Sequence, residues 1–269
     1  MDIKWIAMDM DGTLTTSEKT ITSYTQEVLK KAQEKGIKLI LASGRPTAGL
    51  FREARLLNME SYDGYLLSFN GAHICSAKTS ETFHAQTVEE VLAKRVIEEA
   101  RKRNLDITLH KGNEILIERE NAYKADYEAH ACNMDIRVVD DLTQVLDFDL
   151  HKLLLSAKPD HIQEHIAELQ DVFKDELSIY LSAPFYIEVV PKGIDKGASI
   201  AKLAQLHGVD ASQIIAFGDE RNDLTMLEYV GHGVAMGNAI DEVKAIANEV
   251  TDTNDEDGIA KTLERILAL

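Results

Sequence analysis

Short apolar runs that stop abruptly at a polar residue or a glycine are the feature of this sequence that most restricts its fold. They occur at residues 3–8, 37–42, 65–69 and 214–217. Runs this short and this continuously apolar are typical of strands buried on both faces, as in a parallel sheet. The sequence therefore predicts several strands of one mostly parallel sheet.

The segment between the first two runs has the pattern of a helix. Ser23 and Gln26 have the spacing of a capping box. Val28 and Leu29 supply an apolar stripe, and Gly36 provides a stop. A strand, a helix and a strand in this order predict βαβ units, and hence an open, doubly wound α/β sheet.

Polar residues stand where these predicted strands end, namely Asp9, Ser43, Asn70 and Asp219. In open α/β sheets, ligands bind beyond the carboxyl ends of the strands. We therefore expect the four residues to belong to one site.

The middle of the chain has a different character. Helices are expected at residues 88–103, 123–131 and 160–173, and strands at 107–109, 115–117, 153–155 and 177–181. This mixture is typical of an α+β insertion rather than of more doubly wound sheet. We expect a core domain at residues 1–84 and 185–269, with a cap domain inserted at residues 85–184.

The segment Asp9–Thr13 carries the sharpest chemical signal. Carboxylates at i and i+2, here Asp9 and Asp11, leave a strand on the same side. Their repulsion pushes one toward its protonated form unless a cation intervenes. Such a pair suits an ionised nucleophile beside a proton donor. A strand followed by an ordinary Asp-Gly turn is the competing interpretation of this segment taken alone.

A third carboxylate, Asp219, follows another predicted strand. Mg²⁺ keeps several of its waters, so two carboxylates and a backbone carbonyl are enough to hold it. Helix-capping by Asp219 and a favourable first-turn charge on Asp223 are alternative roles, and both are compatible with metal binding.

Lys196 lies at the start of a helix expected at residues 195–207. A cation there opposes the helix macrodipole unless an anion is bound. With nearby backbone N–H groups it can grip a phosphate, although a solvated lysine is the plainer interpretation of this residue taken singly. Ser43 and Gly44 add a hydroxyl group and flexible backbone at another strand end. As a set, these groups predict phosphoryl transfer to a carboxylate.

Seven motifs follow one another along nearly the whole chain. They are Asp9–Thr13, Ser43–Arg45, Asn70–Ala72, Gly193–Gly197, Gly218–Asp223, Gly233–Ala239 and Asn254–Gly258. In this order they resemble the haloacid dehalogenase superfamily, and within it the Cof-like phosphatases with a type 2B cap. The resemblance implies a Rossmann-like core sheet with an inserted α+β cap. It also implies a Mg²⁺-dependent phosphatase that acts on a small phosphorylated metabolite; sugar phosphates, pyridoxal phosphate and flavin-type phosphates remain open as substrates.

The same resemblance implies a role for each motif residue. Asp9 is the expected nucleophile, which forms a phospho-aspartate, and Asp11 is the expected general acid and base. The expected metal-binding residues are Asp9, Asp11 through its backbone carbonyl, Asp219 and Asp223. The expected phosphate-binding residues are Met10 through its backbone, Ser43, Gly44, Lys196 and Asn222.

Charge and cysteine content exclude some partners. The net charge of −17, from 29 basic and 46 acidic residues, argues against nucleic acid, since its binders carry a basic surface. The two cysteines, Cys75 and Cys132, form no CxxC pair, which favours a reducing compartment. No segment has the length and apolarity of a signal peptide or a membrane span, so we expect a cytoplasmic protein that does not contact a membrane. The oligomeric state cannot be read from the sequence.

Other interpretations concern single features. His161 and His165 match the H-x-x-E-H pattern of some zinc proteases. The apolar stripe of Ile162, Ile166 and Leu169 predicts instead that both histidines lie on the solvated side of their helix, and no third ligand is indicated. A signalling phospho-acceptor also clusters acids and a lysine around an aspartate, but it would not turn over. A non-catalytic protein on the same fold would lack a catalytic residue, and none is missing.

Overall fold

The computed structural model describes residues 2–269 and divides the chain into two compact units. Unit 1 consists of residues 2–84 together with Asp195–Leu269, and unit 2 is Ala85–Ile194. The second boundary differs from the one expected after Pro184. Strand β11 (Tyr186–Pro191) pairs on either side with β10 (Leu177–Ala183) and β9 (Leu153–Ser156), so its residues belong to the sheet of unit 2.

Unit 1 is built on an eight-stranded sheet with the order β14-β13-β12-β1-β2-β3-β4-β5. Its strands are β1 (Trp5–Met8), β2 (Lys38–Ala42), β3 (Tyr65–Ser68), β4 (His73–Ser76), β5 (Thr82–Ala85), β12 (Ile214–Gly218), β13 (His232–Ala235) and β14 (Glu249–Val250). Neighbours from β14 to β3 run parallel, whereas β3 and β4 are antiparallel. The predicted strands at residues 3–8, 37–42, 65–69 and 214–217 are β1, β2, β3 and β12. All residues of the observed strands β1, β2, β3 and β12 are buried, apart from the half-buried Lys38.

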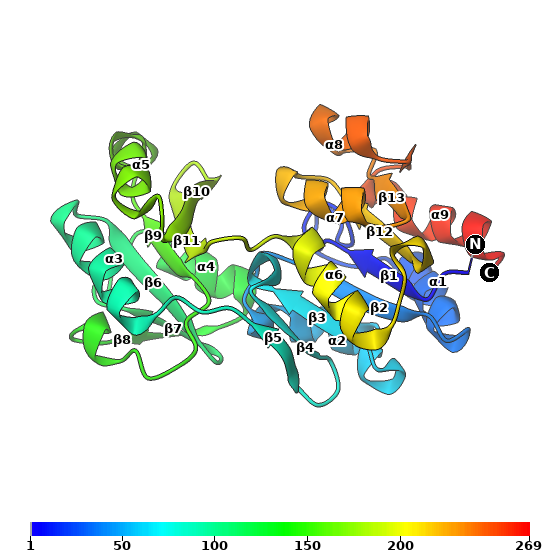
Figure 1. Ribbon diagram of the computed structural model, residues 1–269, viewed down its shortest axis with the longest axis horizontal. Helices are drawn as coiled ribbons and strands as arrows, with labels where there is room; N and C mark the ends of the chain where they lie inside the picture. The colour runs from blue at the N-terminus through cyan, green and yellow to red at the C-terminus, as the bar shows by residue number, and fades with distance from the viewer. Residues whose placement is uncertain (1) are drawn as a thin grey trace. The chain divides into compact units, whose positions relative to one another are not determined.

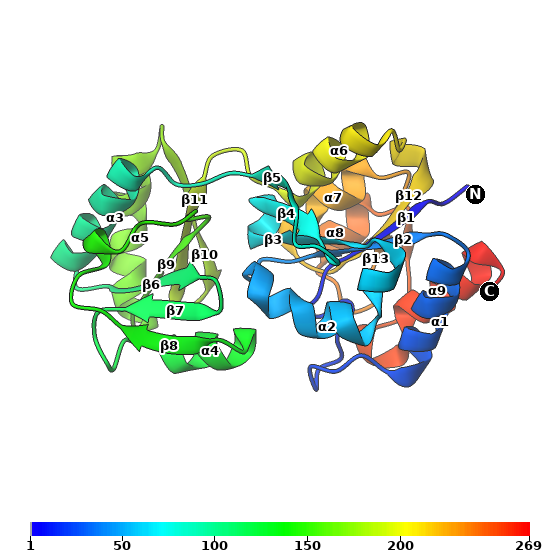
Figure 2. The same ribbon diagram turned by 90° about the horizontal axis from the view of Figure 1, so that it is seen from below.

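Helices cover both faces of this sheet, as Figure 2 shows for α6 and α7 on one side and α1, α2 and α9 on the other. The helices of unit 1 are α1 (Ser23–Glu34), α2 (Phe51–Leu56), α6 (Lys196–His207), α7 (Leu224–Tyr229), α8 (Asp241–Ile246) and α9 (Gly258–Leu267). The predicted doubly wound α/β architecture is therefore confirmed. One local detail was wrong: Thr22, not Ser23, caps α1, and its side chain accepts the backbone N–H of Thr25 at 3.1 Å.

Unit 2 is an α+β fold with a six-stranded sheet in the order β10-β11-β9-β6-β7-β8. Its remaining elements are β6 (Asp106–Lys111), β7 (Glu114–Ile117), β8 (Asp135–Val138), α3 (Glu90–Lys102), α4 (Ala125–Cys132) and α5 (Pro159–Phe173). Helices α3 and α5 lie against one face of the sheet (Figure 1). The predicted helices and strands of this segment are present, whereas β8 and β11 were not predicted.

Side chains alternate between the two faces of the unit 2 sheet. Leu153 and Val189 point into the apolar core that contains α3 and α5. Successive side chains of a strand point to opposite faces, so their neighbours Lys152 and Glu188 lie on the other face. Both of these charged residues are nevertheless buried. In residues 2–269, no helix combines the length and apolarity needed to cross a membrane.

Candidate functional site

The carboxyl ends of parallel strands bring the predicted site residues of unit 1 together. Strands β1 and β12 are neighbours, with Met8 opposite Phe217. Asp9 therefore follows β1 close to the point where Asp219 follows β12. One ligand oxygen from each of Asp9, Asp219 and Asp223 lies within 4.8 Å of those of the other two, and all three residues are buried. This acidic cluster has oxygen donors only and could hold a metal ion.

Lys196 joins this cluster from the first residue of α6. Its ammonium group is fully buried and lies 2.5 Å from Asp9 Oδ1 and 2.6 Å from Asp223 Oδ1. The helix start is fixed by Asp195, whose side chain accepts the backbone N–H of Ala198 at 2.7 Å. The two carboxylates offset the cost of a cation at a helix N-terminus. Lys196 is therefore not the solvated lysine that was the plainer interpretation.

The loop after β1 is held against Asp219. Thr13 donates its hydroxyl to Asp219 Oδ1 at 2.6 Å. Gly12 has a left-handed backbone with φ of +85°, and a Cβ atom there would lie 2.4 Å from Asp219 Oδ2. Only glycine permits both this conformation and this close approach. Asp223 accepts the backbone N–H groups of Asp219 at 2.9 Å and of Glu220 at 3.1 Å, which fixes the loop after β12.

Charge in this cluster is not balanced. Three carboxylates face one lysine, which leaves a formal charge of about −2 when all four groups are ionised. Burial raises the pKa of Asp9, and the charges of Asp223 and Asp219 raise it further against the opposing effect of Lys196. Burial likewise raises the pKa of Asp219 to about 6, from an ordinary value of 3.8. A buried anionic site with this deficit is stabilised by a bound cation.

Asp11 lies in a different electrostatic setting from Asp9. Arg45 donates Nε to Asp11 Oδ2 at 2.8 Å and Nη2 to Oδ1 at 2.7 Å, and Lys19 Nζ lies 2.9 Å from Oδ1. Burial alone would raise the pKa of Asp11, but these cationic donors outweigh burial and lower it. The predicted repulsion between Asp9 and Asp11 is therefore not what sets their pKa values, because each acid has its own cationic partner.

The remaining predicted residues form a connected polar group. Ser43 is buried; its carbonyl accepts the N–H of Asn70 at 2.9 Å. Asn222 donates its side-chain amide to Asn70 Oδ1 at 3.0 Å. A Cβ atom on Gly44 would lie 3.2 Å from Asn70 Nδ2, so the backbone of Gly44 passes close to the same amide. The side chain of Met10 is fully buried in the core, which leaves only its backbone to face a ligand.

Three residues that contact the site were assigned no role from the sequence, namely Thr13, Lys19 and Arg45. Thr13 and Arg45 belong to motifs that were recognised, so their positions carried a signal. Lys19 carried none, since its contact with Asp11 depends on the path of the intervening loop.

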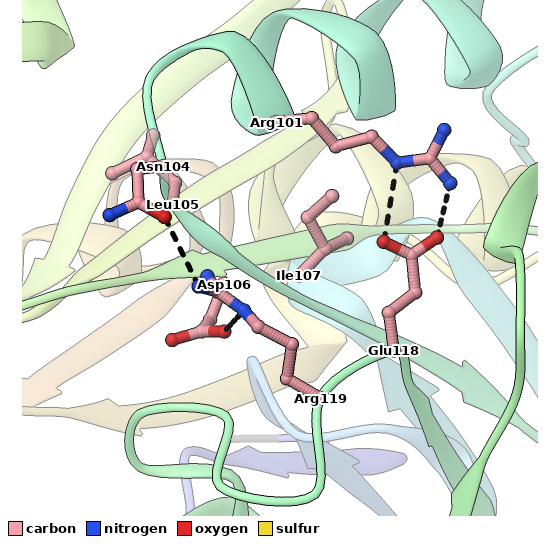
Figure 3. Close-up of a pocket in the computed structure, with 7 residues that line it drawn as sticks. All are labelled: Arg101, Asn104, Leu105, Asp106, Ile107, Glu118 and Arg119. Carbon is pink, nitrogen blue, oxygen red and sulfur yellow. Dashed lines mark hydrogen bonds and ion pairs between the residues drawn. The ribbon is translucent and has the colours of Figure 1, made fainter.

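A hollow lies in unit 2, lined by residues of α3, of β6 and of the segments beside them, several of which are charged (Figure 3). Arg101 pairs with Glu118, and Arg119 pairs with Asp106 at 2.7 Å. Arg119 also donates to the side chain of Asn104 at 3.1 Å. These guanidinium groups are already paired with neighbouring acids. The acidic cluster of unit 1 differs, because its single lysine does not neutralise its three carboxylates.

Comparison with known proteins matches residues 6–263 to the family of haloacid dehalogenase-like hydrolases. A solved structure of a haloacid dehalogenase-like hydrolase from Bacteroides thetaiotaomicron is 37% identical. It superposes with a TM-score of 0.95 and covers 98% of this chain and 99% of that one.

Two of the relatives from Bacillus subtilis strain 168 illustrate a named activity. The 5-amino-6-(5-phospho-D-ribitylamino)uracil phosphatase YitU is 32% identical over 98% of this chain and 97% of its own length. YcsE, a phosphatase of the same name, is 31% identical over 98% of this chain and 95% of its own length.

Proposed function

Since this chain belongs to the haloacid dehalogenase-like hydrolases, and since relatives over its whole length are named phosphatases, we propose that it hydrolyses small phosphate monoesters through a phospho-aspartate on Asp9. The observation that carries this proposal is the buried cluster of Asp9, Asp219, Asp223 and Lys196, with its uncompensated negative charge.

Mg²⁺ fits this cluster better than a softer metal does. The donors are all carboxylate oxygens, which hard cations prefer, and one divalent ion would neutralise the charge of about −2. Asp9, Asp219 and Asp223 would hold the ion, together with the backbone carbonyl of Asp11. A bound Mg²⁺ would supply charge neutralisation for the oxygens of the transferring phosphoryl group.

The chain's own residues then account for both half-reactions. An oxygen of Asp9 attacks phosphorus, the bond from phosphorus to the ester oxygen breaks, and Asp11 gives its proton to the leaving oxygen. In the second step, Asp11 takes a proton from water as the water oxygen attacks phosphorus. The bond to Asp9 then breaks and inorganic phosphate leaves. Asp11 must carry a proton in the first step, so its pairing with Arg45 and Lys19 has to loosen when substrate binds.

The phosphoryl group needs donors for its three peripheral oxygens. Lys196 supplies an ammonium group, and Ser43 supplies a hydroxyl group with the adjacent N–H of Gly44. Asn222 supplies a side-chain amide, held in place by Asn70, and the backbone of Met10 completes the set. These donors allow an anion to bind despite the net charge of −17 on the whole chain.

The substrate we propose first is a flavin-type phosphate. Relatives that include YitU and YcsE are named for 5-amino-6-(5-phospho-D-ribitylamino)uracil, a phosphorylated ribityl compound. Sugar phosphates and pyridoxal phosphate are the other candidates. We propose unit 2 as the cap that selects among them, and the cytoplasm as the place where the protein acts.

The test is a panel of these phosphate esters assayed with Mg²⁺ and with a chelator. Release of phosphate should require Mg²⁺, and rapid quenching followed by mass spectrometry should find a phosphorylated peptide that contains Asp9. Phosphorylation without release of phosphate would favour a signalling phospho-acceptor. Full activity in the presence of the chelator would contradict the proposal.

A further inference from the structure

Helix α5 of unit 2 brings together three side chains that could bind a metal. One ligand atom from each of His161, Glu164 and His165 lies within 4.8 Å of those of the other two. Residues at i, i+3 and i+4 lie on one face of a helix, so the backbone itself arranges these groups. The sequence indicated no third ligand for the two histidines, but Glu164 occupies that position. The two imidazole rings lie edge to face, with 4.8 Å between their centres.

His161 is held in an orientation suited to a metal ligand. Its Nε2 lies 2.7 Å from the backbone carbonyl of Arg103, just after the end of α3. A carbonyl only accepts hydrogen bonds, so Nε2 carries the hydrogen and the lone pair of the neutral ring is on Nδ1. Metal-binding histidines commonly donate their second ring N–H to a carbonyl in this way. Nδ1 lies 3.7 Å from Glu164 Oε2, which is too far for a hydrogen bond. This nitrogen therefore faces the carboxylate of the three-residue group.

His165 has an unsatisfied nitrogen. Its Nδ1 is buried and has no hydrogen-bond partner among residues 2–269. The nearest acid oxygen, Glu168 Oε2, is 3.5 Å away and is already bound by Arg103 Nε at 3.2 Å. A buried polar atom without a partner is unfavourable, and in native structures it commonly indicates a missing water or ion. The histidines are also less exposed than expected, with 35% and 22% of their side-chain surfaces accessible.

Simple charge pairing within the helix explains these observations less well. If charge pairing were the main interaction, each histidine should lie within hydrogen-bond distance of its acid. The two pairs are His161 with Glu164 and His165 with Glu168. Neither pair does so. The hydrogen bond from His161 to the carbonyl of Arg103 also fixes the neutral tautomer without help from Glu164.

We propose that His161, Glu164 and His165 bind Zn²⁺ or a similar divalent transition metal. Two imidazole nitrogens and one carboxylate are a donor set for Zn²⁺, Co²⁺ or Ni²⁺, whereas Mg²⁺ prefers oxygen alone. The exposed Glu164 leaves a coordination position open to water. This site is separate from the acidic cluster of unit 1, and all three of its ligands lie on α5.

The experiment is a titration of the untagged full-length protein with Zn²⁺ in excess Mg²⁺, followed by calorimetry and by imidazole ¹⁵N NMR. One Zn²⁺ should bind per chain and shift the ring nitrogens of His161 and His165. The exposed His130 on α4 should not respond. His161→Gln and His165→Gln should each weaken binding at least about tenfold, the scale found for removing even an outer partner of a metal ligand.

Matched variants separate this site from the one in unit 1. Asp219→Asn should leave Zn²⁺ binding to α5 unchanged, and so should His130→Gln. A shift of the melting temperature by Zn²⁺ should be present in both of these variants and absent from His161→Gln. Retention of the bound Zn²⁺ by the double variant His161→Gln/His165→Gln, or its displacement by Mg²⁺, would overturn the proposal. Neither result bears on catalysis at Asp9.

Discussion

Each unit of the chain buries a cluster of charged side chains, and the two clusters differ in how well their carboxylates are neutralised by neighbouring donors. In unit 1, Asp9, Asp219 and Asp223 share Lys196, and the pKa values of Asp9 and Asp219 are raised. In unit 2, every buried acid has its own donors. His110 Nε2 and Cys132 Sγ donate to Glu128, at 3.0 and 3.7 Å.

The second acid of unit 2 is equally well satisfied. Lys152 Nζ donates to Glu188 Oε1 at 3.1 Å, and the hydroxyl of Tyr180 donates to Oε2 at 3.1 Å. Burial would raise the pKa of Glu128, but the bond from His110 and the charge of Lys152 outweigh it and lower that pKa to about 2. The difference teaches that burial alone does not mark a functional site. The cluster that still requires a cation is the candidate for chemistry, and the satisfied one is structural.

The largest expected effect separates the two clusters by activity. Asp9→Asn replaces the proposed nucleophile with an amide and should reduce the rate of ester hydrolysis by roughly 10⁴–10⁶-fold, the scale on which removal of a nucleophile acts. Glu128→Gln makes the same kind of change in the cluster of unit 2 and should leave kcat nearly intact. Steady-state kinetics on one active ester checks both variants. Near-native turnover by Asp9→Asn would break the comparison.

The next effect concerns folding stability. Lys152→Met leaves Glu188 and Glu128 buried without their cation, and breaking a buried pair in this way costs about 3–5 kcal/mol. Lys196→Met leaves three carboxylates together in unit 1, but Mg²⁺ can take over part of the lost charge. Urea denaturation with and without Mg²⁺ should therefore show partial rescue of Lys196→Met and no rescue of Lys152→Met. Equal rescue of both variants would contradict the contrast.

Stability should also depend on pH in opposite directions in the two units. The pKa of Asp219 is raised from 3.8 to about 6, so this group costs the metal-free protein stability as pH rises through that window. Mg²⁺ competes with the same proton, and its stabilising effect should grow from pH 4 to above pH 6. At a concentration of 100 times its Kd it should reach about 2.7 kcal/mol.

Glu128 behaves in the reverse sense. Its pKa is lowered from 4.5 to about 2, so it contributes stability above pH 4.5 that is lost as pH falls toward 2. Mg²⁺ should not change that loss. Thermal unfolding recorded across pH 2–8, with and without Mg²⁺, tests both statements. A stabilising effect of Mg²⁺ that is the same at pH 4 and pH 7 would argue against a metal at Asp219.

The smallest effect is a difference in sign. Asp219→Asn removes one charge from a cluster with excess negative charge and should stabilise the metal-free protein, by about 1–2 kcal/mol after allowance for screening by nearby solvent. The same variant should lose the stabilisation by Mg²⁺. Glu128→Gln should instead destabilise the protein, because it removes the negative charge that the bond from His110 and the charge of Lys152 stabilise. Chemical denaturation in a chelator distinguishes the outcomes; destabilisation by both substitutions would remove the proposed difference.

Much of the site could be predicted because parallel strands place their carboxyl ends at one edge. Asp9 and Asp219 needed only the recognition of two apolar runs, and their approach follows from the pairing of β1 with β12. The partners of Asp11 could not be predicted, since Arg45 and Lys19 reach it through loops whose paths depend on tertiary packing. Strand β11 was missed for a related reason: its place between β9 and β10 is decided by pairing with residues distant in sequence.

The capping of α1 illustrates the limit of local patterns. Thr22 and Ser23 are adjacent hydroxyl residues, and either could cap the helix by composition alone. Thr22 has the extended backbone that a cap requires, with φ of −62° and ψ of 152°. Its hydroxyl also bonds to Asp257, a residue at the far end of the sequence. This tertiary contact therefore supports Thr22 as the cap of α1, in addition to its local backbone conformation.

Insertion of unit 2 between the two parts of unit 1 has a consequence for biosynthesis. The central strand β1 pairs with β12, so one side of it stays unpaired until the ribosome has made residue 218. Unit 2 is contiguous and can fold as soon as its last strand emerges, whereas unit 1 closes its sheet only afterwards. Non-local pairing of this kind slows folding and leaves a strand edge exposed to other chains. Nascent chains that end between residues 194 and 218 should therefore be the species most dependent on chaperones.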